Sequence, residues 1–146
     1  AGDGPLEPLI RQQVTKTGLG ECFEFLGYCR HIPEYLKFCN FLVLPSLWEG
    51  MPLAILEAYN AGKTVLATDI PGTNETVQHG HTGVLVPPGN CKALSKAMVE
   101  MIDQPAKVEL LSQNALQWCR QEFSFEKMIT HYLNLYREVL NGEKPA

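Results

Sequence analysis

Residues 43–58 read Val-Leu-Pro-Ser-Leu-Trp-Glu-Gly-Met-Pro-Leu-Ala-Ile-Leu-Glu-Ala, the most informative stretch of the chain. It begins inside a wholly apolar run, Phe41 to Leu44, which Pro45 closes. Such a run is typical of a parallel strand buried on both faces. A turn through Glu49 and Gly50 follows, and apolar residues then recur at helical spacing over about 51–61. The pattern predicts a strand, a tight turn and a helix.

Strand and helix patterns alternate along the rest of the chain. The predicted strands cover 22–26, 41–44, 64–68 and 83–86. The predicted helices cover about 5–17, 32–39, 51–61, 74–77, 91–103, 106–122 and 125–140, with Ser124 as N-cap of the last. This alternation predicts a single α/β domain, a Rossmann-like parallel sheet with helices on both faces. Ligands of such sheets bind where the strands end, so the loops after Leu26, Leu44, Thr68 and Val86 are candidate site loops.

Composition excludes several classes of partner. The chain has 146 residues and a net charge of −4, without two adjacent basic residues, which argues against a nucleic-acid-binding face. No apolar stretch approaches the roughly 20 residues that span a bilayer. Five cysteines without a C-x-x-C pair predict buried free thiols in a reducing, cytoplasmic compartment. His79-Gly80-His81 predicts an exposed turn rather than half of a metal site.

The turn and the helix start predict an anion site that needs no basic side chain. Unpaired N–H groups around Met51 to Leu53 point toward the strand end, and Gly50 has no Cβ to hold a phosphate away. Glu57 lies further along the helix, where its carboxylate can accept hydrogen bonds from a ribose diol. Spacing alone favours Glu49 and Glu57 being ordinary surface acids, because two glutamates eight positions apart are common.

The same stretch resembles the E-x7-E signature of retaining GT-B glycosyltransferases, the large group 1 or family 4, with Glu49 and Glu57 at the two glutamate positions. Further blocks stand in that family's order, and they are residues 2–5, 25–28, 65–69, 71–72 with Glu75, 82–89 and 122–126. The resemblance covers nearly the whole chain. It implies the C-terminal nucleotide-sugar-binding domain of a GT-B fold, residues 1–146, with its first strands missing.

The resemblance also implies a role for each site residue. Glu49 would be the catalytic residue, facing the donor sugar and the reacting end of the diphosphate, and Glu57 would bind the ribose. The donor pocket would be lined by the backbone of Gly50, Met51, Pro52 and Leu53, although Pro52 has no N–H to donate. Tyr28 and Ile32 would lie beside the base. Many members have Phe-Gly where Met51-Pro52 stand here, so the donor sugar stays open. The resemblance implies no cofactor and no bound metal.

The function that the resemblance implies is transfer of a sugar from a nucleoside diphosphate sugar to an acceptor hydroxyl, with retention of configuration. The acceptor, a sugar or a lipid-linked glycan, would bind an N-terminal domain that precedes these residues, and the parent enzyme would associate with the cytoplasmic face of a membrane. A basic pair that grips the diphosphate in the family has no counterpart here. Residues 1–146 alone are therefore expected to bind nucleotides weakly and to be inactive.

Two other functions fit the same fold. A non-catalytic nucleotide-binding or interaction module would share the architecture, because fold does not imply function. The presence of both glutamates around the Gly50 turn favours the enzyme. A nucleotide-sugar epimerase lacks support from the sequence blocks.

Overall fold

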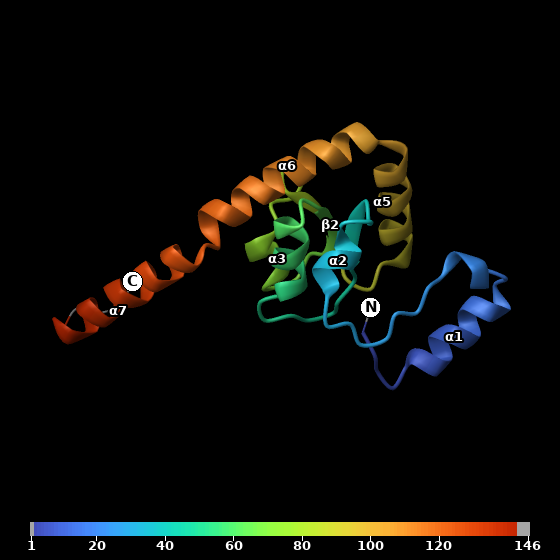
Figure 1. The fold of residues 1–146 in the computed structure, drawn as a ribbon, viewed down its shortest axis with the longest axis horizontal. Coiled ribbons are helices and arrows are strands. Elements are labelled where there is room, and N and C mark those ends of the chain that lie inside the picture. Colours follow the sequence, from blue (N-terminus) through green and yellow to red (C-terminus); the bar gives the residue numbers. More distant parts are fainter. Residues whose placement is uncertain (1, 143–146) are drawn as a thin grey trace. The chain divides into compact units, whose positions relative to one another are not determined.

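A computed structural model describes residues 2–142 and divides the chain into two compact units, Ala1–Tyr35 and Leu36–Ala146 (Figure 1). The interpretation of the chain as a single domain stays a prediction.

The first unit is built on helix α1, Glu7–Lys16, followed by the 3-10 turn η1, Gly20–Cys22. The prediction of a strand over 22–26 is wrong. A strand needs a neighbour that pairs its N–H and C=O groups, and this segment has none among the described residues. Its apolar side chains are accommodated differently, because the Arg11 guanidinium lies 4.2 Å from the centre of the Phe25 ring. Arg11 is itself held by Glu7 at 2.7 Å.

The second unit contains a parallel sheet of strands β1 Phe41–Leu44, β2 Thr64–Thr68 and β3 Gly83–Val86, in the order β1-β2-β3. The register places Leu42 beside Val65 and Leu66 beside Val84. The described residues thus form three strands rather than the four predicted. Strand β2 is buried throughout, because it is paired on both edges. Strand β1 is only half-buried rather than fully buried, because one of its edges is open, although Phe41 and Val43 pack against the core.

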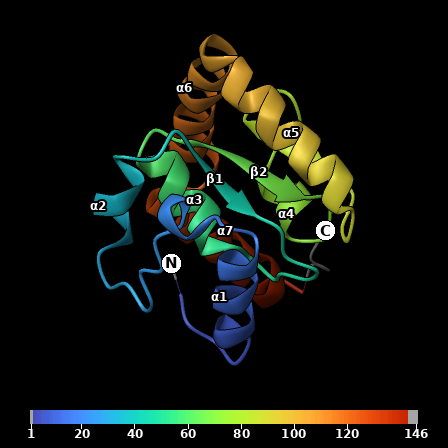
Figure 2. The same ribbon diagram turned by 90° about the vertical axis from the view of Figure 1, so that its right-hand side faces the viewer.

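Helices cover both faces of this sheet, as the sequence predicted. Helix α3, Leu53–Asn60, packs against β1 and β2, and α5, Cys91–Asp103, packs against β3, so the sheet lies between them (Figure 2). Helix α6, Pro105–Glu122, contacts β2, β3 and both helices. The remaining helices are α2 Ile32–Leu36, α4 Thr73–Thr76 and α7 Phe125–Leu140.

Helix α7 begins where the sequence predicted, because the Ser124 hydroxyl accepts a hydrogen bond from the Lys127 N–H at 3.1 Å. Its apolar residues recur at helical spacing, but none of its side chains is buried. Among the helices of the described residues, none is both long and apolar enough to cross a membrane.

The prediction that the cysteines are buried holds only for Cys119. Cys22, Cys39 and Cys91 are exposed and Cys29 is half-buried. Apolar neighbours in the sequence suggested burial, but these cysteines lie in loops or at the ends of helices, where neighbouring elements do not cover them. Burial raises the pKa of the Cys119 thiol.

A chain of buried hydroxyl groups joins helix α3 to the rest of the second unit. The Tyr59 hydroxyl lies 3.0 Å from that of Thr82, which also accepts from the Gln78 N–H at 2.9 Å. The Thr64 hydroxyl donates to the Thr82 carbonyl at 2.9 Å, and the Thr64 N–H donates to the Ser112 hydroxyl at 3.0 Å. The carboxyl-terminal half of α3 is therefore tied to β2, to the turn before β3 and to α6.

Burial raises the pKa of Tyr59 well above its usual range. We therefore expect this residue to destabilise the fold at alkaline pH. Above about pH 10 the tyrosine of the unfolded chain loses its proton while the folded one keeps it, so stability falls by up to about 1.4 kcal/mol per pH unit. Tyr59→Phe should lower stability near neutral pH by about 0.5–1.5 kcal/mol, since Thr82 loses a partner, and should make the alkaline decline shallower.

Urea denaturation of both chains between pH 8 and pH 11 measures this difference. Tyr132→Phe, which removes an exposed hydroxyl from α7, serves as the matched control. An alkaline decline equally steep in Tyr59→Phe and in the native chain would contradict the expectation.

Candidate functional site

The candidate site is built where β1 ends and α3 begins. Pro52 precedes the helix with an extended backbone and is buried, so the helix starts at Leu53 and not at Met51. The Ile55 N–H donates to the Pro52 carbonyl at 2.9 Å. The N–H groups of Leu53 and Ala54 precede the first complete turn and have no acceptor within the helix. They provide the positive end of the helix dipole at this strand end.

Helix α3 separates its buried and exposed faces cleanly. Ile55, Ala58 and Tyr59 are buried against the sheet, whereas Glu57 is exposed. Glu57 is four positions after Leu53, which corresponds to a rise of about 6 Å along the helix axis. The carboxylate of Glu57 is thus accessible to a ligand bound at the helix start.

Glu49 lies in the loop between β1 and α3 and is half-buried. Its Oε1 accepts a hydrogen bond of 2.7 Å from the Ser46 hydroxyl. The Ser46 carbonyl in turn accepts one of 2.5 Å from the hydroxyl of Thr68, the last residue of β2. Glu49 is therefore connected through Ser46, in the loop after β1, to Thr68 at the end of β2.

A backbone contact joins the same loop to the loop that follows β2. Gly72 has a φ of +81°, and a Cβ at this position would lie 2.0 Å from the Gly50 carbonyl oxygen and 2.9 Å from that of Glu49. Only glycine fits such an approach. Gly72 thereby sets how closely the Glu49–Gly50 turn lies to α4.

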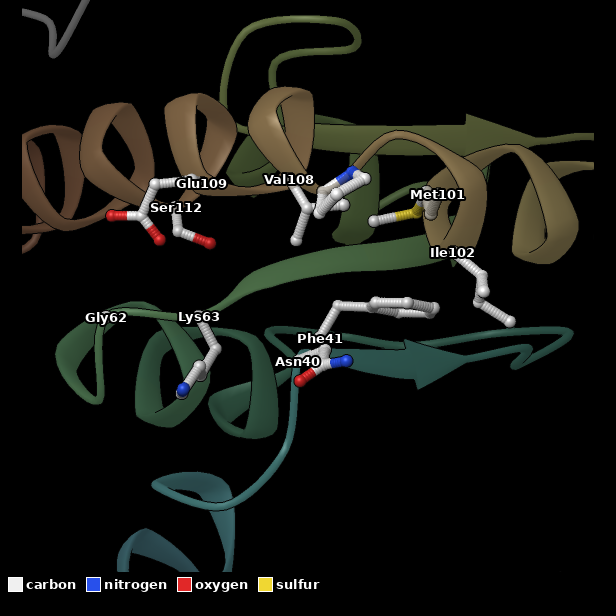
Figure 3. A pocket seen from close by; sticks show the side chains of 10 residues that line it. Asn40, Phe41, Gly62, Lys63, Met101, Ile102, Val108, Glu109 and Ser112 are labelled. Atoms are coloured by element: carbon white, nitrogen blue, oxygen red, sulfur yellow. The ribbon is translucent and has the colours of Figure 1, made fainter.

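Two hollows of the second unit lie at opposite ends of the strands. One of about 100 Å³ is at the carboxyl ends and is lined by Pro45, Leu47 and Thr68, among others. A second of about 240 Å³ opens at the amino ends, with Met101 and Ile102 on its helix side and Phe41 on its strand side (Figure 3). None of the predicted site residues lines either of these two hollows.

Comparison with known families fits this geometry. The family model of glycosyl transferases group 1 matches residues 1–104. The chain belongs to this family. The predicted fold is confirmed as well, since solved glycosyltransferases of GT-B architecture superpose on it over part of their length.

Three relatives show how much of a group 1 glycosyl transferase these residues represent. Alpha-D-kanosaminyltransferase of Streptomyces kanamyceticus is 28% identical over 95% of this chain and 36% of its own length. UDP-Gal:alpha-D-GlcNAc-diphosphoundecaprenol alpha-1,3-galactosyltransferase of Escherichia coli is 32% identical over 95% of this chain and 36% of its own length. The crystal structure of Anabaena Alr3699/HepE in complex with UDP-glucose is 27% identical and has a TM-score of 0.86, covering 94% of this chain and 39% of that one. The chain thus spans well under half of each relative.

In this member of the glycosyl transferase group 1 family, one part of the predicted site is continuous. Glu49, Gly50, Met51, Pro52 and Leu53 form one continuous loop and helix start, and Glu57 lies on the same helix. The base-binding residues predicted from the family, Tyr28 and Ile32, belong to the first unit, and their role stays a prediction.

Sequence reasoning missed the residues that support Glu49. Ser46 and Thr68 were each part of a recognised block without an assigned role, and the contact between Gly72 and Gly50 was not expected. The sequence signal that could have indicated this support was a short hydroxyl side chain at or just after the end of each of two adjacent strands. His79, Gly80 and His81 are exposed, as the sequence predicted. The His79 Nδ1 accepts from the Leu85 N–H at 2.9 Å.

Proposed function

We propose that these residues form the donor-binding domain of a retaining glycosyltransferase, which transfers a sugar from a nucleoside diphosphate sugar to an acceptor hydroxyl. The observation that carries the proposal is the combination of free amides at the start of α3 with Glu49 and Glu57 on either side of them. A diphosphate binds at helix N-termini because the amides and the dipole favour anions. The complex of Anabaena Alr3699/HepE with UDP-glucose supports a nucleotide sugar as the donor.

The chemistry assigned to this domain is mainly stabilisation of charge. As the donor bond breaks, negative charge develops on the departing diphosphate, and fixed amide dipoles such as those of Leu53 and Ala54 stabilise it. Glu49 acts at the donor sugar. The leaving phosphate assists attack by the acceptor on the same face, which gives retention without a protein nucleophile. The reaction uses neither a cofactor nor a bound metal.

In this proposal the acceptor binds to a part of the enzyme outside these residues. We assign it to the class of sugars or lipid-linked glycans, and we place the reaction at the cytoplasmic face of a membrane. The name of the E. coli relative, which acts on a diphosphoundecaprenol-linked sugar, supports this class.

Glu57→Gln in the whole transferase tests the ribose contact. The substitution should weaken nucleoside diphosphate binding about 10- to 150-fold, the equivalent of a hydrogen bond to a charged group worth about 1.5–3 kcal/mol. The fold should be unchanged, because Glu57 is exposed. Calorimetric titration measures the affinity, and Glu100→Gln, an exposed glutamate of α5, is the matched control. Equal affinities of the Glu57→Gln and native enzymes would refute the ribose contact.

A further inference from the structure

We propose that Ser46 and Thr68 are positioning residues for Glu49, which hold its carboxylate at the angle that the donor sugar requires. This inference rests on the proposed role of Glu49 at the donor. It adds residues from two strand ends, neither of which is expected to touch the ligand.

The loop that carries Glu49 has little packing of its own. Leu47 is 69% exposed, Trp48 is 85% exposed and Met51 is 55% exposed. Apolar contacts therefore restrain this loop weakly, and a glutamate side chain has several rotamers to choose from. The 2.7 Å bond from the Ser46 hydroxyl selects one of them.

The support for Ser46 comes from the most deeply buried strand of the sheet. Thr68 is 3% exposed and ends β2, the strand that is buried along its whole length. Its hydroxyl holds the Ser46 backbone at 2.5 Å. The buried strand β2 therefore fixes Thr68, and the Thr68 hydroxyl fixes the backbone of Ser46. The Ser46 hydroxyl in turn orients the carboxylate of Glu49.

The two oxygens of the Glu49 carboxylate have different surroundings and, in this proposal, different roles. Oε1 is engaged by Ser46, and the described residues provide no hydrogen bond to Oε2. A carboxylate has lone pairs on both oxygens. Oε2 is thus left for the donor while Oε1 fixes the orientation.

Steady-state kinetics of the whole transferase test the proposal. Ser46→Ala should lower kcat about 10-fold, the smaller end of what a hydrogen bond to a charged group contributes, while KM for the donor stays within about 2-fold. Ser46→Thr keeps the hydroxyl and should restore most of the turnover. Thr68→Val should lower kcat in the same way, and Thr68→Ser should restore it.

A double-mutant cycle separates positioning from general structural damage. If Ser46 acts through Glu49, Ser46→Ala should cause no further loss of kcat in an enzyme that already carries Glu49→Ala. A second loss as large as that in the native background would overturn the positioning role. A turnover unaffected by Ser46→Ala, in an enzyme that Glu49→Ala does impair, would overturn it too. Native turnover in Glu49→Ala would instead refute the proposed role of Glu49 and remove the basis of this inference.

Discussion

Replacement of Glu49 by alanine is expected to lower kcat of the whole transferase by at least about 100-fold, while the Kd of the nucleoside diphosphate changes little. A group that acts at the reacting sugar contributes more to the transition state than to the bound nucleotide. Glu49 stands in the loop before the helix start, and its carboxylate is held by Ser46. In the proposed function, the free amides of α3 bind the diphosphate, so nucleotide affinity should not depend on Glu49.

Two measurements establish this pattern, namely turnover at saturating donor and calorimetric affinity for the nucleoside diphosphate. Glu57→Gln provides the contrast, because it should affect affinity where Glu49→Ala affects turnover. Near-native kcat in Glu49→Ala would exclude the assigned role. A loss of nucleotide affinity that accounts for the whole fall in kcat/KM would move Glu49 from catalysis to binding.

Gly72→Ala is expected to produce the largest loss of stability among single substitutions near the site, about 2–5 kcal/mol. Two costs add. A residue with a side chain is strained at a φ of +81°, and its Cβ would lie 2.0 Å from the Gly50 carbonyl oxygen. Relief requires the Glu49–Gly50 turn to move away from α4, so the nucleotide-sugar site should be distorted as well.

Gly80→Ala is the matched control for Gly72→Ala. Gly80 also has a positive φ, +75°, but a Cβ there would meet nothing within 4 Å. It should cost only the backbone strain, about 1–2 kcal/mol. Urea denaturation of residues 1–146 gives both values. Equal losses of stability in the two variants would show that the Glu49–Gly50 turn moves without cost and that Gly72 does not fix its position.

A helix or strand was predicted correctly where the pattern that specifies it lies within its own segment of the sequence. Strands β2 and β3 and helices α5 and α7 match their predicted bounds, because periodicity and caps such as Ser124 are encoded within each segment. The segment 22–26 has the composition of a strand, but pairing depends on a neighbour that a local pattern cannot supply. The half-buried state of β1 has the same cause, because burial of a strand depends on what lies at its open edge.

In the candidate site, too, residues of one continuous stretch could be predicted, whereas contacts between distant parts of the chain could not. Glu49, Gly50 and Glu57 were predicted from a continuous stretch and lie where a strand end and a helix start require. The bond between Thr68 and Ser46 spans 22 residues, and the approach of Gly72 to Gly50 spans a similar length of chain. Contacts of this kind arise only when β1 and β2 are paired side by side.

The hydroxyl chain around Tyr59 has a consequence for how donor preference diversifies within the family. It fixes one end of α3 through buried groups, so that end tolerates few substitutions. The other end begins at Leu53, which is 65% exposed, and Met51 just before it is 55% exposed, so neither side chain is part of the core. A directed library can therefore vary these two residues of the proposed donor site without loss of the fold. We expect new specificities to be obtained at lowest risk by varying Met51 and Leu53 while Tyr59 and Thr82 are kept.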